Sequence, residues 1–83
     1  MDTMREKKMQ VTVLYFAYLR EERGLTQEIV SCPETMTVKE LFYQVFQREA
    51  TGIRFSVNQE FVASEQEIEE GDEIAFLPPV GGG

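Results

Sequence analysis

Residues 37–49 carry the strongest local pattern in the sequence. Five apolar side chains recur there at the spacing of one face of an α-helix, namely Val38, Leu41, Phe42, Val45 and Phe46. Thr37 and Glu40 have the spacing of a capping box, in which each side chain accepts a hydrogen bond from a free backbone N–H of the first turn. Met36 stands at the hydrophobic-staple position outside this cap, and Gly52 fits a helix stop. The pattern predicts one amphipathic helix whose apolar stripe packs on a core.

Short apolar stretches of strand length lie on both sides of this helix. We expect strands over residues 10–16, 26–31, 53–58, 61–62 and 73–77. The first should be a central strand, because both of its faces are largely apolar. One face carries Val11, Val13 and Tyr15, and the other carries Thr12, Leu14 and Phe16.

Three connecting segments complete the pattern. Residues 17–24 fit a loop or a short helical turn, and Gln59-Glu60 and Gly71-Asp72 fit turns. Residues 63–70 are polar and acidic, with Ile68 as their only apolar anchor. The expected order is strand, strand, helix and then three strands. This order predicts an α+β domain with one main helix packed on one face of a mixed β-sheet.

The length and the charge limit what the chain can do. An 83-residue chain supports one small domain, and we expect a flexible arm over residues 1–8, a domain over 9–77 and an extended tail over 78–83. The net charge of −7 disfavours nucleic acid and anionic membranes as partners, because an acidic surface repels both. No apolar run is long enough to span a bilayer, and the first nine residues lack the apolar stretch of a signal peptide. A cytoplasmic location is therefore expected.

Side chains that commonly perform chemistry are scarce. The chain has no histidine, which removes the commonest general base and the commonest metal ligand. Its single cysteine, Cys32, cannot form an intramolecular disulfide, and we expect it to be buried or half-buried. Carboxylate pairs such as Glu21-Glu22 fit a solvated charged surface. We therefore expect no bound cofactor or metal, and the sequence does not indicate a stand-alone enzyme.

The last six residues directly follow the last predicted strand and read Pro78-Pro79-Val80-Gly81-Gly82-Gly83. Two prolines hold a chain extended, and glycines can enter a tunnel too narrow for larger residues. Six extended residues span about 20 Å, which is enough to reach a buried active site on a partner. A bare glycine run would more simply be a frayed terminus or a linker. The strand and the rigid approach instead favour a working tail whose reactive group is the Gly83 carboxylate.

The residues over 11–17, 57–62 and 71–83 together resemble the small subunits of molybdopterin synthase. The ending G-D-E-x-A-x-x-P-P-V-x-G-G is the specific part, and the resemblance spans about residues 9–83. It implies the ubiquitin-like β-grasp fold. It also implies that a ubiquitin-activating-type adenylyltransferase uses ATP to adenylate the Gly83 carboxylate, and that a sulfur donor protein then makes it a thiocarboxylate.

The resemblance further implies a partner and residue roles. The tail would enter the large subunit of the synthase, in a heterotetramer of two small and two large subunits, and pass sulfur to cyclic pyranopterin monophosphate. The catalytic lysines would belong to the large subunit. Gly82 and Gly83 match the terminal pair of the family, whereas Gly81 stands where serine or threonine is frequent, so the tail should be looser but functional. The residues expected to contact partners are Phe16, Leu77, Leu14 and Ala75. For Leu14 and Ala75, a place in the core is an equally good interpretation.

Three other interpretations stay open. A sulfur carrier of another pathway, such as the thiamine-pathway protein, would share the fold and the Gly-Gly end, although the Pro-Pro-Val approach and the chain length argue against it. A ubiquitin-like modifier would use the same activated tail to form an isopeptide bond with lysines of target proteins. A plain interaction domain would make no use of the tail.

Overall fold

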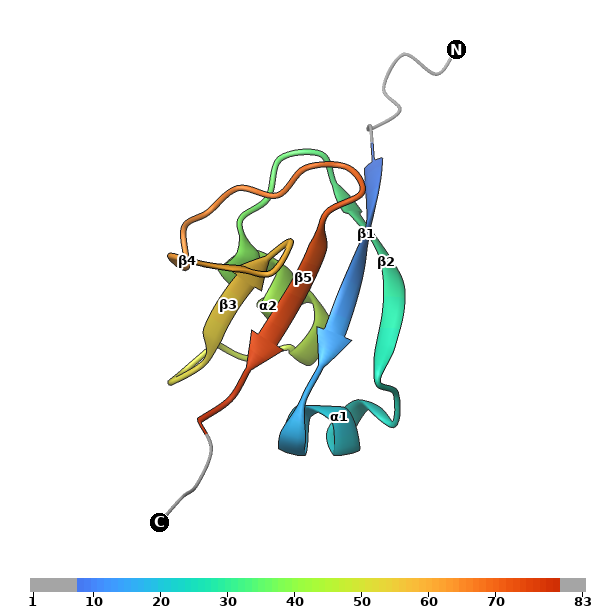
Figure 1. The fold of residues 1–83 in the computed structure, drawn as a ribbon. Helices are drawn as coiled ribbons and strands as arrows, with labels where there is room; N and C mark the ends of the chain where they lie inside the picture. Colours follow the sequence, from blue (N-terminus) through green and yellow to red (C-terminus); the bar gives the residue numbers. More distant parts are fainter. Residues whose placement is uncertain (1–7, 80–83) are drawn as a thin grey trace.

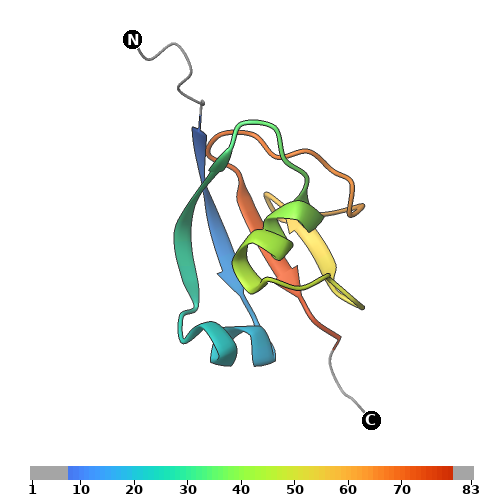
Figure 2. The ribbon, with the colours of Figure 1, turned by 180° about the vertical axis from the view of Figure 1, so that it is seen from behind.

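The computed structural model describes residues 8–79, and residues 1–7 and 80–83 lie outside that range. A five-stranded sheet faces the viewer in Figure 1, and the view from behind in Figure 2 shows α2 lying across its other face. In chain order the elements are β1 (Lys8–Tyr15), α1 (Ala17–Arg23), β2 (Gln27–Pro33), α2 (Val38–Phe46), β3 (Arg54–Val57), β4 (Glu60–Val62) and β5 (Glu73–Leu77). The predicted α+β class, with one main helix on a mixed sheet, is confirmed.

The strand order across the sheet is β2-β1-β5-β3-β4. β1 and β5 are parallel, with Val13 opposite Ile74, and the other pairings are antiparallel. Parallel neighbours need a long crossover, because the second strand must start at the same edge as the first. Since β1 lies between β2 and β5, it is an interior strand, as its two largely apolar faces predict. β2 extends two residues beyond the predicted 26–31, to Pro33, which an edge strand tolerates because its outer N–H groups need no partner.

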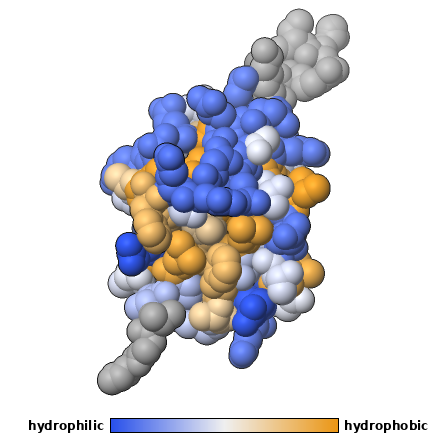
Figure 3. Space-filling view, viewed as in Figure 1, coloured by the Kyte–Doolittle hydropathy of each residue, from blue (hydrophilic) through white to orange (hydrophobic). Residues whose placement is uncertain are grey.

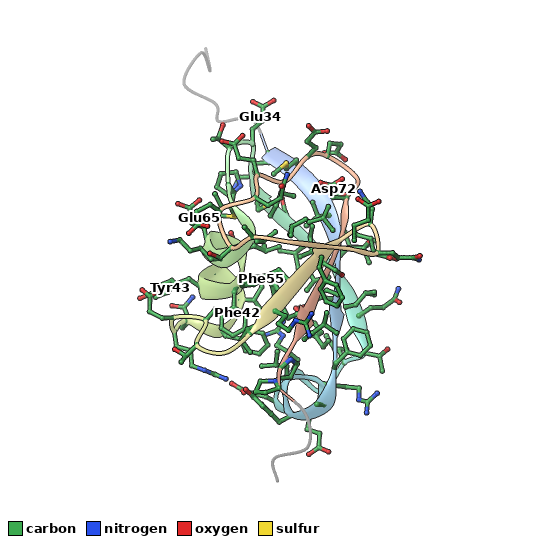
Figure 4. All side chains as sticks on the ribbon, turned by 60° about the vertical axis from the view of Figure 1, so that its left-hand side comes forward. Glu34, Phe42, Tyr43, Phe55, Glu65 and Asp72 are labelled. Atoms are coloured by element: carbon green, nitrogen blue, oxygen red, sulfur yellow. The ribbon has the colours of Figure 1, made fainter. Side chains whose placement is uncertain are left out.

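The core lies between the sheet and α2 and is centred on Phe76 of β5. The Phe76 ring centroid lies 5.1 Å from that of Phe42 and 5.7 Å from that of Phe55, both in near edge-to-face arrangements. Figure 4 shows Phe42 and Phe55 between α2 and the sheet, with Tyr43 directed outward. The other fully buried side chains are Val11, Val13, Tyr15, Leu19, Cys32, Val38, Leu41 and Ile74. The helix stripe and one face of β1 thus form one core, as predicted, and Cys32 is buried.

The start of α2 follows the predicted capping box. The Thr37 hydroxyl oxygen accepts the Glu40 N–H at 3.3 Å, and the Glu40 carboxylate accepts the Thr37 N–H at 2.9 Å. These two bonds satisfy backbone donors that have no partner inside the helix. The isolated bridge between Thr37 and Glu67 also ties this cap to the loop before β5.

The end of α2 differs from the prediction. The helix ends at Phe46, and Gln47 takes the left-handed conformation with φ 60° and donates its N–H to the Tyr43 carbonyl at 2.8 Å. The predicted helix over 37–49 with a stop at Gly52 is therefore too long. Phe46 is the last large apolar residue of the stripe, so packing on the core gives little support to a further helical turn.

The first strand also differs at both ends. β1 begins at Lys8, inside the predicted arm over 1–8, and ends at Tyr15. Phe16 leaves the ladder because its carbonyl accepts backbone N–H groups from the first turn of α1. Residues 17–24, expected to form a loop or a short helical turn, form a seven-residue helix closed by Gly24 in the left-handed conformation with φ 73°.

The hairpin of β3 and β4 turns one residue earlier than predicted. Val57 pairs with Glu60, so the two turn residues are Asn58 and Gln59, both with positive φ, at 52° and 74°. Two central residues with positive φ are what a two-residue hairpin requires, and asparagine tolerates this conformation well. The strand predicted over 53–58 is accordingly shorter by one residue at each end.

The acidic segment between β4 and β5 is held at two points. Ile68 is 3% exposed and donates its N–H to the Met36 carbonyl at 2.9 Å, which confirms it as the apolar anchor. At the far end, the Asp72 carboxylate accepts the Glu69 N–H at 2.8 Å and the Asn58 side-chain amide at 2.9 Å. β5 therefore enters the centre of the sheet from a fixed turn.

Candidate functional site

The base of the tail lies at the end of the central strand β5. Pro78 is buried and Pro79 is exposed. Pro79 lies beside the loop that follows α2, since a Cβ placed on Gly52 would lie 4.0 Å from Pro79 Cγ. Proline has no N–H to donate, so the pairing of β5 with its neighbours stops here. The remaining tail residues predicted to enter a partner lie outside the described residues, and they are Val80, Gly81, Gly82 and Gly83.

The face of the sheet opposite α2 is open and partly apolar. Cross-strand pairing places one outward row over all five strands, made of Gln27, Leu14, Ala75, Ser56 and Phe61. The next row toward the tail sets Arg54 beside Leu77. Figure 3 shows apolar residues gathered on the lower half of this face, where β5 ends, and hydrophilic residues across its upper half. The open-face patch is defined here as Leu14, Phe16, Phe61, Ala75 and Leu77.

The patch is defined to include the four contact residues predicted from the sequence, and the structure gives them different exposure. Phe16 is 39% exposed, and Leu14 and Leu77 are partly exposed. Ala75 is only 6% exposed, because it is a small residue flanked across the strands by Leu14 and Ser56. A partner can reach Phe16, Leu77 and Leu14 directly, whereas Ala75 supplies the flat floor between larger neighbours.

Phe61 is the most exposed member of the patch, at 63%, and the sequence prediction does not include it. It lies opposite Ser56 on β3 and so projects from the open face. The alternation of side chains along β4 could have identified Phe61. Val62 packs against the core, so the preceding residue, Phe61, must face the opposite side of the sheet. A large exposed aromatic side chain on the same sheet face as Ala75 and Leu77 indicates a contact surface.

A polar network fixes the place of Phe16 at the edge of the patch. The Tyr15 hydroxyl donates to Glu28 Oε2 at 2.5 Å, and Arg23 Nη2 donates to the same oxygen at 2.5 Å. The guanidinium of Arg23 also lies 5.7 Å from the centroid of the Tyr15 ring. One carboxylate thus joins β1, β2 and the last turn of α1. Because Phe16 follows Tyr15 and caps α1, the network holds it from both sides.

The pKa values in this network suit a structural role. Burial, together with the hydrogen bond to Glu28, raises the pKa of Tyr15. Burial alone would raise the pKa of Glu28, but the hydrogen bonds from Tyr15 and Arg23 outweigh it and hold that pKa below its usual value. At neutral pH, Tyr15 is therefore protonated and Glu28 is charged. Both groups thus keep one protonation state near neutral pH, which suits a network that positions the backbone.

Charge is divided unevenly between the two ends of the domain. The arginines among residues 8–79 gather near the end where β5 leaves the sheet; they are Arg20 and Arg23 on α1, Arg48, which pairs with Glu22 of α1, and Arg54, which lies beside Leu77. The loop before β5, at the opposite end of the sheet in Figure 1, is acidic and holds Glu65, Glu67, Glu69, Glu70 and Asp72. The open-face patch therefore lies at the more basic end of an acidic chain.

Two other kinds of site, metal centres and membrane-spanning helices, are not found in the part of the chain that the structure describes. Among residues 8–79, no three side chains of histidine, cysteine, aspartate or glutamate lie close enough together to hold a metal ion. No helix in that range has the length and apolarity to cross a membrane. The Cys32 thiol is buried, and burial together with the nearby Glu70 charge raises its pKa, so it is not a ready nucleophile.

A mixed five-stranded sheet wrapped on one helix, with the chain leaving from its central strand, defines a ubiquitin-like β-grasp protein. Solved structures agree. A Pyrococcus furiosus structure assigned as molybdopterin converting factor subunit 1 has a TM-score of 0.73 and 26% identity, over 87% of this chain and 99% of that chain. Small archaeal modifier protein 1 from Methanosarcina acetivorans has a TM-score of 0.68 and 26% identity, over 93% of this chain and 99% of that chain. One chain of a complex of subunits 1 and 2 of the molybdopterin-converting factor from Helicobacter pylori has a TM-score of 0.62 and 23% identity, over 90% and 100% of the respective chains.

The chain belongs to the ThiS family, which it matches over residues 13–83. Its curated relatives include the molybdopterin synthase sulfur carrier subunit of Homo sapiens, which is 35% identical over 89% of this chain and 94% of the relative. The subunit of the same name from Chlamydomonas reinhardtii is 30% identical over 90% of this chain and 100% of the relative. The resemblance to the molybdopterin synthase small subunits is therefore confirmed over nearly the whole chain.

Proposed function

We propose that this chain is a sulfur carrier in molybdopterin biosynthesis. The observation that carries the proposal is a juxtaposition: the open-face patch and the base of a Gly-Gly tail share one end of a β-grasp domain. A docking surface at the same end as an extended tail suits a protein that delivers its own C-terminus to the active site of a partner. The identity of 35% to a curated sulfur carrier subunit supports the same conclusion.

The reacting group in this proposal is the carboxylate of Gly83. In a ubiquitin-activating-type adenylyltransferase it attacks the α-phosphorus of ATP, which releases pyrophosphate and leaves an acyl adenylate. Sulfur at the oxidation level of hydrosulfide, delivered by a donor protein, then attacks the carbonyl carbon. AMP departs with one of the original carboxylate oxygens, and the product is a thiocarboxylate. The chain supplies the reacting end and no catalytic side chain.

Delivery requires the large subunit of molybdopterin synthase as a partner. The open-face patch docks on that subunit, and the tail, about 20 Å long from Pro78 when extended, enters its active site. The thiocarboxylate sulfur passes to cyclic pyranopterin monophosphate, and hydrolysis by water returns Gly83 to a carboxylate. Two such transfers supply both dithiolene sulfurs, which suits a heterotetramer with two carriers. The likeness to a chain from a complex of subunits 1 and 2 supports a large-subunit partner.

The direct test is to locate sulfur at Gly83. The full chain is incubated with the adenylyltransferase encoded by the same genome, ATP and sulfide, and the product is alkylated at the thiocarboxylate and fragmented in a mass spectrometer. Intact mass alone is insufficient, because oxidation of one of the four methionines adds nearly the same mass. Sulfur on the terminal fragment is expected. Turnover of ATP without sulfur at Gly83 would show that the tail is not a sulfur carrier.

Two tail variants, one a test and the other its control, address the role of the terminal residue. Deletion of Gly83 should abolish molybdopterin formation while leaving the melting temperature and large-subunit binding close to those of the native chain. Gly81→Ser introduces the residue type frequent in the family and should keep full activity. If the deletion variant still supports molybdopterin synthesis with the purified large subunit, the terminal-carboxylate mechanism is wrong.

A ubiquitin-like modifier is the second candidate, favoured by the likeness to small archaeal modifier protein 1 at 26% identity. It uses the same adenylated tail but ends in an isopeptide bond to a lysine of a target protein. The two functions differ in what happens after activation. A chain that forms lysine-linked adducts in its native cells, and none when Gly83 is deleted, would be a modifier in addition to, or in place of, a carrier.

A further inference from the structure

Arg54 is an exposed cation beside two apolar members of the open-face patch, Phe61 and Leu77. Its guanidinium lies 4.2 Å from the centroid of the Phe61 ring, and its backbone lies opposite Leu77, at the base of the tail. Arg23 and Arg48 are each engaged by a glutamate at 2.5 and 2.6 Å. By contrast, no acidic side chain among residues 8–79 lies within ion-pair distance of Arg54. In the domain itself, an aromatic face takes the place of a counter-charge.

A partner that covers Phe61 must also cover this guanidinium, because the two groups are in contact. Removing a charge from water is costly unless the partner offers hydrogen-bond acceptors or an opposite charge. The face of a benzene ring attracts the cation but offers no oxygen or nitrogen acceptor, so the guanidinium N–H donors still call for acceptors from a partner. The group that matches two parallel N–H donors is a carboxylate. A surface that covers both Arg54 and Phe61 should therefore combine an apolar pocket with an acidic rim.

We propose that Arg54 is a specificity residue for docking, and that the large subunit sets an aspartate or glutamate carboxylate against it beside the pocket that receives Phe61. This inference rests on the proposed function, and it adds the chemistry that selects the partner. A chain of net charge −7 is attracted to any basic surface. A required carboxylate at one point rejects basic surfaces that lack it, because their contact with Arg54 would be repulsive or unpaired.

The test is calorimetric binding of the full chain to the large subunit encoded by the same genome. Arg54→Gln removes the charge from an exposed site and should weaken binding by about tenfold or more, as expected for loss of a charge-assisted hydrogen bond. Arg54→Lys keeps the positive charge but lacks the planar guanidinium, so its dissociation constant should lie between those of the native chain and Arg54→Gln. Lys39→Gln is the matched control, because it also removes one exposed positive charge, but from α2 on the other side of the sheet. It should change the dissociation constant by less than about twofold.

A second arm identifies the carboxylate. Each acidic residue on the docking surface of the large subunit is changed to lysine, one at a time. Because the charges are then exchanged, one of these variants should bind Arg54→Glu well. The same variant should bind the native chain more weakly. Native-like binding by Arg54→Gln, or failure of every exchange to restore Arg54→Glu, would overturn the proposal. Those results leave native binding and Gly83 sulfuration intact, so they are distinct from failure of the proposed function, in which the native chain does not bind the large subunit at all. Thermal melting of each variant confirms that the domain is folded.

Discussion

The hydroxyl of Tyr15 donates a 2.5 Å hydrogen bond to the carboxylate of Glu28, 13 residues further along the chain. The two meet because the β1–β2 hairpin sets Val13 opposite Glu28, so that the longer tyrosine side chain reaches across the strand end. The contact matters beyond the hairpin, since Arg23 of α1 binds the same carboxylate oxygen. One ionised glutamate therefore helps to hold α1, and with it Phe16, against the strands, in addition to the buried Leu19 and the Arg48–Glu22 ion pair.

Glu28→Gln should lower the free energy of unfolding at pH 7 by about 1 kcal/mol, at the low end for hydrogen bonds to a charged group because the site is partly exposed. The folded-state pKa of Glu28 lies below its usual value. The stabilisation is thus present above the unfolded-state pKa of about 4.3 and is lost as the pH falls through the folded-state pKa. Urea unfolding of both proteins at pH 7 and pH 3 measures this, and the gap should close at the lower pH. Glu21→Gln, on the exposed surface of α1, is the control. A gap that does not change with pH would show that ionisation of Glu28 is not the cause.

Phe76→Ala should be severely destabilising, by about 3–5 kcal/mol, because it opens a cavity at the centre of the aromatic core. The ring it removes is fully buried and packs against four others, those of Tyr15, Phe42, Phe46 and Phe55. Phe61→Ala is the matched control, since the same atoms are removed from a side chain that is 63% exposed, and it should cost less than about 1 kcal/mol. Chemical denaturation distinguishes the two, and similar losses would mean that the core is not centred on β5.

Thr37→Ala should destabilise the domain by about 1 kcal/mol, because the Glu40 N–H loses its side-chain partner. For a domain of this size, the melting temperature should fall by about 4–8 °C. Thr35→Ala is a control for the loss of a threonine hydroxyl two residues earlier, outside the cap. Equal melting temperatures for Thr37→Ala and the native chain would mean that the capping box adds nothing to stability.

Phe61→Ala should weaken binding of the large subunit by about thirtyfold or more, the effect expected for a buried aromatic anchor at a protein interface. Tyr43→Ala serves as the control, because Tyr43 is similarly exposed, at 50%, but lies on the outer surface of α2 (Figure 4). Titration calorimetry with the purified large subunit checks both. A larger effect from Tyr43→Ala would place docking on the helical side of the domain.

Much of the fold could be predicted because apolar spacing reports which face of an element is buried. The stripe from Val38 to Phe46 and the cap at Thr37 located α2, and β5 was predicted with both of its ends, because Gly71-Asp72 and Pro78 mark them. The failures concern where elements stop. Gln47 and Gln59 take positive φ without being glycine, so composition gave no warning of these turns. In each case tertiary packing and pairing overrode local preference.

The candidate site was predictable only in part, for a different reason. The family resemblance led to Phe16 and Leu77, and strand alternation added Leu14 and Ala75. Phe61 and Arg54 were missed because their closeness depends on the pairing of β3 with β4 and β5, which no local spacing reports. Strand register is set by the whole sheet. A short strand such as β4, with three residues, carries too little alternation to assign its faces with ease.

The place of β5 in the sheet has a consequence for biosynthesis. Among residues 8–79 it is the last strand in sequence order, yet it is the strand that joins the β1–β2 pair to the β3–β4 hairpin. While a ribosome has released only the segment up to residue 72, the two strand pairs have no shared strand and Phe76 is missing from their common core. Cooperative folding must await translation of residues 73–77, as the long sequence separation between β1 and β5 also requires. A prematurely terminated chain would therefore not form a smaller functional domain. It would leave two strand pairs with unpaired edges that are prone to aggregation.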